Sequence, residues 1–171
     1  EKKRKLNFLE VGCSNGRFLL SLKKKFKNIN VFGVDPSKLA IMDLKKKKIK
    51  CKVGTADELK FKKNSFDIIY YGFCLYLCDE KYYNNILRCA RKILIEDGYI
   101  IIFDFFSKKL KKNIYKHDKR ITSIKYDFRK IFQKKNKFNC IDHKLYNYSN
   151  MFRVKNSEKG DLLSISVLKK I

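Results

Sequence analysis

The sequence has 171 residues, 44% of them hydrophobic, and a formal net charge of +25. This length is typical of one domain with its own buried core. No stretch approaches the ~18 uninterrupted apolar residues of a membrane-spanning helix, and the opening EKKRK is unlike a signal peptide. We therefore expect a single domain over residues 1–171, located in the cytoplasm and not bound to a membrane.

The six cysteines, at positions 13, 51, 74, 78, 89 and 140, form no C-x-x-C pair. Without a secretory signal they are expected to be reduced thiols. Cys74 and Cys78 are four residues apart, but no histidine or second cysteine pair completes a metal site. The sequence therefore predicts no bound metal.

The basic charge could indicate a nucleic-acid partner. However, most of the 42 basic residues are lysines spread along the chain, whereas phosphate and base readout favours arginine. Lysine, asparagine, isoleucine, phenylalanine and tyrosine all have A/T-rich codons, so genome composition can explain the bias. A nucleic-acid partner stays an alternative that the composition does not favour.

The hydrophobic pattern predicts alternating strands and helices. Short apolar runs indicate strands, and apolar residues three or four positions apart indicate helices. Pro36 is expected to start the second helix, and Asp79 to cap a third that Asp97-Gly98 ends. In chain order the expected elements are strand 5–11, helix 15–26, strand 30–35, helix 36–48, strand 50–56, strand 66–72, helix 79–94 and strand 99–106. This alternation predicts an α/β fold with five parallel strands and helices on both faces.

The pattern changes after the fifth strand. Residues 107–122 are expected to form a polar, lysine-rich loop, followed by a short amphipathic helix around 125–134. Two further strands are expected at 138–148 and 161–168, joined by the turn KNSEKG (155–160). Their closeness in the sequence predicts an antiparallel hairpin added to the edge of the sheet.

The turn after the first strand is the most informative feature. In FLEVGCSNG (8–16) small residues occupy positions 12, 14 and 16, Glu10 precedes them, and the second strand ends in Asp35. The glycines allow a sharp turn and bring the next helix close to a ligand. Arg17 stands where a dinucleotide fingerprint needs glycine or alanine, which argues against an NAD site.

The E-x-G-x-(G/S)-x-G spacing of residues 10–16 resembles motif I of the class I S-adenosylmethionine (SAM)-dependent methyltransferases. VGTADELKF (53–61), NSFDIIYYGFCLYLCD (64–79) and LRCARKILIEDGYIIIFDF (87–105) resemble later blocks of the small-molecule, methyltransferase-11/25-like branch of that family. The resemblance implies SAM as cofactor. It also implies a Rossmann-like, doubly wound, three-layer α/β/α sandwich, with five parallel strands ended by an antiparallel hairpin to give seven strands.

The resemblance also implies roles for particular residues. The amides of the glycine turn would face the methionine carboxylate, since a helix N-terminus favours an anion, and Glu10 would lie near the methionine amino group. Asp35 would accept from the ribose hydroxyls, although it could instead cap the second helix. Asp57 would accept from the adenine amine, or be a solvated turn residue, and Gly72 would lie at the reactive methyl. The predicted cofactor-binding residues are Glu10, Gly12, Cys13, Ser14, Asn15, Gly16, Asp35, Pro36, Thr55, Ala56, Asp57 and Gly72.

Some residues depart from the family pattern or have no fixed role. Thr55 stands where an aspartate usually contacts adenine, which is why Asp57 is considered in its place. Tyr70, Tyr71, Phe73 and Tyr76 are expected mostly in the core, although one of them could stack on adenine or line the substrate pocket. His117, in the loop after the fifth strand, is a candidate catalytic residue, although a lone loop histidine is more often a surface residue.

The acceptor is expected to be a small molecule. The N/D-P-P-Y/F motif of many nucleic-acid and protein amino-nitrogen methyltransferases is replaced by YYGF after the fourth strand. The alternatives are a methyltransferase acting on RNA or protein, and a non-catalytic SAM-binding domain. Because the first strand starts almost at residue 5, we expect the domain to lack the N-terminal cap segment common in the family. The sequence carries no signal for an oligomeric state.

Overall fold

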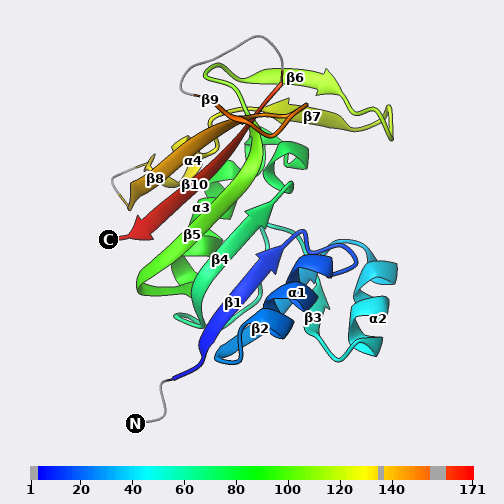
Figure 1. Ribbon diagram of the computed structural model, residues 1–171, viewed down its shortest axis with the longest axis vertical. Helices are drawn as coiled ribbons and strands as arrows, with labels where there is room; N and C mark the ends of the chain where they lie inside the picture. The colour runs from blue at the N-terminus through cyan, green and yellow to red at the C-terminus, as the bar shows by residue number, and fades with distance from the viewer. Residues whose placement is uncertain (1–3, 135–136, 155–160) are drawn as a thin grey trace.

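The computed structural model describes residues 4–134, 137–154 and 161–171. Within these residues the main sheet is built from β1 (Leu6–Val11), β2 (Ile29–Asp35), β3 (Lys50–Val53), β4 (Phe66–Gly72), β5 (Leu94–Phe106), β8 (Phe138–Asn147), β9 (Arg153–Val154) and β10 (Leu162–Lys170). The spatial order is β3-β2-β1-β4-β5-β10-β8-β9 (Figure 1). Strands β1 to β5 are parallel, and β10 is antiparallel to both β5 and β8.

Helices cover both faces of this sheet (Figure 1). They are α1 (Arg17–Lys25), α2 (Lys38–Lys46), α3 (Tyr83–Ile93) and α4 (Arg129–Phe132). Leu19 and Leu44 of α1 and α2 pack with Phe8 in one core, whereas Ile86 of α3 packs with Leu9 in the other. Neighbouring residues of β1 thus point to opposite faces, as a pleated strand requires. The predicted three-layer α/β/α fold is confirmed, but the main sheet has eight strands instead of the predicted seven, because the short β9 pairs with β8 at its edge.

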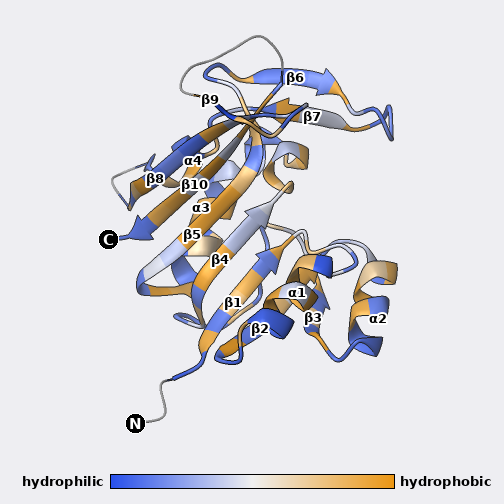
Figure 2. Cartoon of the chain, in the orientation of Figure 1, coloured by the Kyte–Doolittle hydropathy of each residue, from blue (hydrophilic) through white to orange (hydrophobic). Residues whose placement is uncertain are grey.

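The strands at the centre of the sheet are largely apolar, as Figure 2 shows for β1, β4 and β5. Strands buried on both faces need such runs because neither face meets water. The lysine-rich ends of α1 and α2 lie at the surface. No helix in the described parts of the chain is long and apolar enough to cross a membrane.

The first two helices begin later than predicted. Gly16 has a positive φ of 70° and lies outside the helix, so α1 begins at Arg17 instead of residue 15. Ser37 caps α2 by accepting a hydrogen bond from the backbone of Ala40 at 3.3 Å. Pro36 therefore precedes the cap and does not start the helix. The third strand also ends earlier, at residue 53 instead of 56.

The third helix differs more from its predicted range, 79–94. Asp79 does not cap it: its side chain accepts a backbone hydrogen bond at the start of a 3₁₀ turn, η2 (Glu80–Tyr82), and α3 follows. The prediction that Asp97-Gly98 ends the helix is wrong, because α3 ends at Ile93 and this pair lies inside β5. Asp97 has a φ of +59°, and the pairing of β5 with β4 shifts in register nearby. The pair therefore accommodates an irregularity of the strand.

The predicted loop 107–122 is wrong. It contains β6 (Lys111–Ile114), which pairs with β7 (Thr122–Lys125) in a separate antiparallel sheet that lies beyond the carboxyl ends of the central strands (Figure 1). Because β7 runs to Lys125, the helix expected at 125–134 is reduced to the single turn of α4. The hairpin of β8 and β10 is confirmed, and the turn predicted at 155–160 lies outside the described residues.

Candidate functional site

The predicted cofactor residues lie at the carboxyl ends of four neighbouring strands. Glu10 and Gly12 are at the end of β1, and Asp35 ends β2. Residues 55–57 follow β3, and Gly72 ends β4. Since these strands are adjacent and parallel, their ends meet at one edge of the sheet, which is where open α/β sheets bind their ligands.

The glycine turn needs its glycines for both conformation and space. Gly12 and Gly16 have φ angles of +77° and +70°, which L side chains rarely adopt. A Cβ on Gly12 would lie 2.9 Å from the Cβ of Cys74, in the loop after β4. A Cβ on Gly16 would lie 2.0 Å from Cδ2 of Leu44 in α2. The turn is therefore packed tightly between its neighbours.

Most backbone amides of this turn already have acceptors within the protein. Gly12 and Cys13 donate to the Val34 carbonyl at 2.8 and 3.1 Å, Ser14 donates to Asp35 at 2.8 Å, and Gly16 donates to the Cys13 carbonyl at 2.8 Å. Among the described residues, the amide of Asn15 has no hydrogen-bond acceptor. The predicted contact of this turn with the methionine carboxylate therefore depends on Asn15 and the first turn of α1.

Asp35 joins the glycine turn to the start of α2. Its side chain is buried, with Oδ2 accepting from the Ser14 amide at 2.8 Å and Oδ1 from the Ser37 amide at 2.9 Å. Ser37, and not Asp35, is the helix cap. A carboxylate oxygen has two lone pairs, so each oxygen can accept one further hydrogen bond from a ligand hydroxyl.

Glu10 carries the clearest mark of a ligand site. It is only 6% exposed, and its Oε2 is buried without a hydrogen-bond partner among the described residues. Burial, and then the charge of Asp35, raises the pKa of Glu10 to about 8. A buried carboxylate without a partner is unfavourable, and a ligand ammonium group would compensate it. The methionine end of SAM carries such a group, so this corner of the site fits the cofactor.

The segment after β3 offers a second group of contacts. Thr55 is exposed, Ala56 is buried, and Asp57 is half-buried. The Asp57 carbonyl accepts a hydrogen bond from the Cys89 thiol at 3.2 Å. The Asp57 carboxylate makes no hydrogen bond to the described residues, so it stays available for the predicted adenine contact.

Asp104 is a structurally important residue that the sequence analysis missed. It is completely buried in β5, and its Oδ2 accepts backbone hydrogen bonds from Cys74 and Tyr76, both at 3.2 Å. Burial raises the pKa of Asp104 to about 7. These bonds hold the start of the 3₁₀ turn η1 (Leu75–Leu77), whose preceding residue, Cys74, lies against Gly12. A single carboxylate within the apolar run YIIIFDFF is the signal that could have revealed it.

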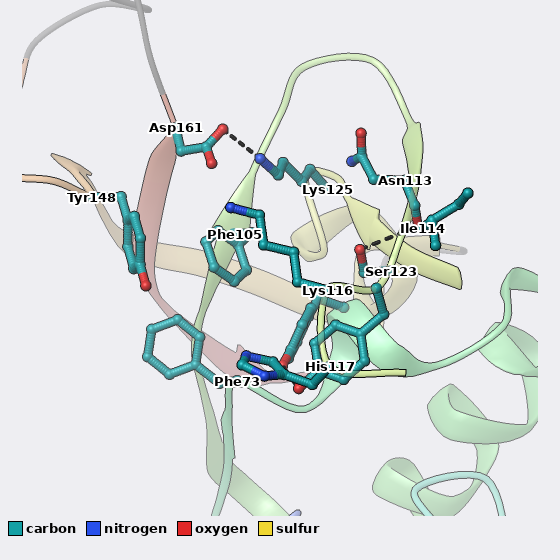
Figure 3. A pocket seen from close by; sticks show the side chains of 12 residues that line it. Phe73, Phe105, Asn113, Ile114, Lys116, His117, Ser123, Lys125, Tyr148 and Asp161 are labelled. Carbon is teal, nitrogen blue, oxygen red and sulfur yellow. Dashed lines mark hydrogen bonds and ion pairs between the residues drawn. The ribbon is translucent and has the colours of Figure 1, made fainter. Parts of the chain in front are cut away.

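A cavity of about 710 Å³ lies between the carboxyl edge of the sheet and the β6–β7 hairpin (Figure 3). We call it the hairpin cavity. It is lined by Phe73, Tyr76, Phe105, Asn113, Ile114, Tyr115, Lys116, His117, Ser123, Lys125, Tyr148 and Asp161. None of the predicted cofactor residues lines it, but Phe73 directly follows Gly72. The hairpin cavity therefore adjoins the predicted position of the reactive methyl.

The predicted cofactor residues lie at the carboxyl edge of the sheet, which we call the cofactor edge. The candidate catalytic residue His117 lies in the hairpin cavity and not at this edge. Its ring packs against Tyr115, with the ring centroids 5.2 Å apart. Five of the twelve lining residues come from the segment that was predicted as a loop, and of these five the sequence analysis singled out only His117. No group of three histidine, cysteine or acidic residues in the described ranges could hold a metal ion.

Comparisons with known proteins agree with this arrangement. Residues 9–102, more than half of the chain, match the model of a family described as a methyltransferase domain. No curated protein sequence matches the chain.

Several solved structures have the same fold at low sequence identity. A SAM-dependent methyltransferase from Methanosarcina mazei is 15% identical, with a TM-score of 0.77 over 99% of this chain and 94% of that chain. The 1,6-didemethyltoxoflavin-N1-methyltransferase of Burkholderia thailandensis, bound to 1,6-didemethyltoxoflavin and S-adenosylhomocysteine, is 17% identical, with a TM-score of 0.75 over 98% and 72%. A Haloferax volcanii methyltransferase in complex with the Trm112 methyltransferase activator is 16% identical, with a TM-score of 0.71 over 96% and 83%. The family match and the fold together identify this chain as a member of the class I SAM-dependent methyltransferases.

Proposed function

We propose that this enzyme transfers the methyl group of SAM to a small molecule bound in the hairpin cavity. The observation that carries the proposal is the position of this cavity, which begins at Phe73, directly after Gly72. Its volume of about 710 Å³ falls within the range of small-molecule sites, roughly 300–1,000 Å³. A non-catalytic SAM-binding domain would not need an acceptor cavity beside the cofactor edge.

The lining of the hairpin cavity carries little positive charge, although the hairpin also has exposed lysines outside the lining, such as Lys111 and Lys112. Two lysines line the hairpin cavity, and one of them, Lys125, is paired with Asp161. Other lysines, such as Lys23 and Lys50, line a separate surface hollow away from the cavity. The methyltransferase of Burkholderia thailandensis, which has the same fold, is named for a small-molecule substrate.

Within this proposal different residues of the cofactor edge would contact different parts of SAM. Glu10 would pair with the ammonium group, because its buried Oε2 has no other partner in the described residues. Asp35 would accept from the ribose hydroxyls, and Asp57 from the adenine amine. The amide of Asn15 would donate to the carboxylate. The remaining predicted residues would form the walls around the ligand: Gly12, Cys13, Ser14, Gly16, Pro36, Thr55, Ala56 and Gly72.

The protein's contribution to the chemistry is alignment and exclusion of water. When bound, SAM supplies an electrophilic methyl group attached to a sulfonium. As the methyl group is transferred, the sulfur–methyl bond breaks and the rest of the cofactor leaves as a neutral thioether. Holding two reactants in line can lower the activation free energy by about 7–11 kcal/mol. The Tyr76 and Tyr115 hydroxyls lie 3.4 Å apart in the cavity wall and can orient the acceptor. Burial raises the pKa of Tyr76, so its hydroxyl stays a donor, and His117 is placed to accept a proton from the acceptor.

Transfer of tritium from methyl-labelled SAM tests this function. The enzyme is incubated with the low-molecular-weight fraction of a cell extract, and separately with RNA and protein from the same extract. We expect label in small molecules, lost in Asp35→Ala and retained in Asp43→Ala. Asp43 is the control because it is an exposed carboxylate of α2. Label in RNA or protein alone would contradict the proposal.

A further inference from the structure

The wall of the hairpin cavity is rich in aromatic rings that come from separate segments. They are Phe73 after β4, Tyr76 in η1, Phe105 in β5, Tyr115 after β6 and Tyr148 after β8. The centroid of Phe105 lies 5.6 Å from that of Phe73, 5.3 Å from Tyr76 and 5.3 Å from Tyr148. Phe73 and Tyr148 are 38% and 51% exposed, so part of each ring is open to a ligand. Such a wall favours a flat, conjugated ligand.

Among the described residues, one of the two lysines that line the same cavity has no acidic partner. Lys125 pairs with Asp161, and its ammonium lies 5.5 Å from the centroid of Phe105. Lys116 forms no ion pair within the described part of the chain, and Figure 3 shows its side chain extending into the pocket. Although Lys116 is exposed, its ammonium group beside the aromatic walls can form a charge-assisted hydrogen bond with an anionic ligand.

The polar groups of the wall are suited to a ring substituent. The Tyr76 and Tyr115 hydroxyls lie 3.4 Å apart, and the His117 ring packs against Tyr115. These groups occupy the aromatic part of the cavity, whereas the Lys125–Asp161 pair and Asn113 come from the hairpin strands and the start of β10. The cavity therefore offers stacking surfaces, a small set of hydrogen-bonding groups and one cation that has no ion pair with any described residue.

We infer that the methyl acceptor is a planar aromatic acid, with its ring between the aromatic side chains and its anionic group at Lys116. This inference rests on the proposed function, since it assigns the chemistry of the acceptor in the same cavity. Phe73 and Tyr148 are the specificity-determining residues for the ring, and Lys116 is the one for the charge. A nucleotide of RNA also combines an aromatic ring with an anionic group, and the experiment below distinguishes a free aromatic acid from RNA.

Three matched probes test the inference in the full-length chain saturated with S-adenosylhomocysteine. They are 2-naphthoate, the neutral 2-naphthamide, and decahydro-2-naphthoate, which keeps the charge but is not planar. We expect 2-naphthoate to bind about tenfold more tightly than either comparison compound, equal to about 1.4 kcal/mol. Equal affinities for all three probes, in protein that binds S-adenosylhomocysteine, would overturn the inference and leave the small-molecule function standing.

Two variants assign the interactions to their residues. Lys116→Met should remove the preference for 2-naphthoate over 2-naphthamide, whereas Lys119→Met, an exposed lysine outside the lining, should keep it. Tyr148→Leu should weaken both aromatic probes and leave decahydro-2-naphthoate unchanged. A short single-stranded RNA that displaces 2-naphthoate and accepts the methyl group, while small molecules stay unlabelled, would overturn both this inference and the proposed function.

Discussion

Replacing Glu10 by glutamine tests whether its buried carboxylate is a preformed cation site. The pKa of Glu10 is about 8 in the folded protein without ligand, against an ordinary value of 4.5. Since folding raises this pKa, the stability that the group contributes is fully present below pH 4.5 and is lost as the pH rises through 8. Between pH 5 and pH 8 the linkage relation gives a loss of about 3.5 kcal/mol.

Urea denaturation at pH 5, 6, 7 and 8 measures this loss. The stability of Glu10→Gln relative to wild type should increase by about 3.5 kcal/mol across the series, because an amide does not titrate. Glu58→Gln is the control, since Glu58 lies exposed at the surface and its variant should follow the wild type. Equal pH dependence in wild type and Glu10→Gln would refute the reasoning.

The same residue should make cofactor binding depend on pH. The ammonium group of S-adenosylhomocysteine needs the ionised carboxylate, so the affinity of the wild type should rise by about tenfold from pH 6 to pH 7 and by about fivefold from pH 7 to pH 8. Glu10→Gln should bind more weakly and without this slope. Calorimetry at each pH measures both, and a flat profile for the wild type would contradict the assignment of Glu10.

Three further changes follow from the site. Asp104→Ala leaves the part-buried amides of Cys74 and Tyr76 without their acceptor. Urea denaturation should therefore show that the free energy of unfolding falls by about 3 kcal/mol, and a fall of less than about 1 kcal/mol would contradict the role of Asp104. Gly16→Ala forces a Cβ to within 2.0 Å of a Leu44 methyl carbon at a positive φ, which should cost about 2 kcal/mol or more and weaken S-adenosylhomocysteine binding. Gly54→Ala, whose Cβ would meet nothing nearer than 3.2 Å, is its control. Burial raises the pKa of the Cys13 thiol to about 12. Iodoacetamide at pH 8 should therefore leave Cys13 unlabelled in the folded protein, which mass spectrometry can measure. Rapid labelling of Cys13 would contradict this prediction.

The parts of the fold that could be predicted are those determined by local sequence. The glycine turn and the strand ending in Asp35 have spacings that only a sharp strand-to-helix connection accommodates. The structure places Glu10 and Asp35 at adjacent strand ends, as parallel pairing of β1 and β2 requires. The long apolar run of β4 likewise has few alternatives to a buried strand.

The parts that could not be predicted depend on contacts distant in the sequence. All four residues of β6 are exposed, so no alternation of apolar and polar residues marks it as a strand, and it forms by pairing with β7. Asp97-Gly98 has the composition of a helix terminator. However, Phe66 of β4 pairs with Leu94, so β5 already begins before this pair. The hairpin cavity could not be foreseen, because it exists only where this hairpin meets the ends of β4 and β5.

The most direct test of the central claim is calorimetric titration of S-adenosylhomocysteine into the wild type, Asp35→Ala and Asp43→Ala. Asp35 holds the glycine turn and offers further lone pairs to a ligand, whereas Asp43 is an exposed residue of α2. We predict one site with micromolar affinity in the wild type and in Asp43→Ala, and no binding in Asp35→Ala. A folded wild type that gives no heat, or an Asp35→Ala variant that binds as tightly as the wild type, would contradict the account.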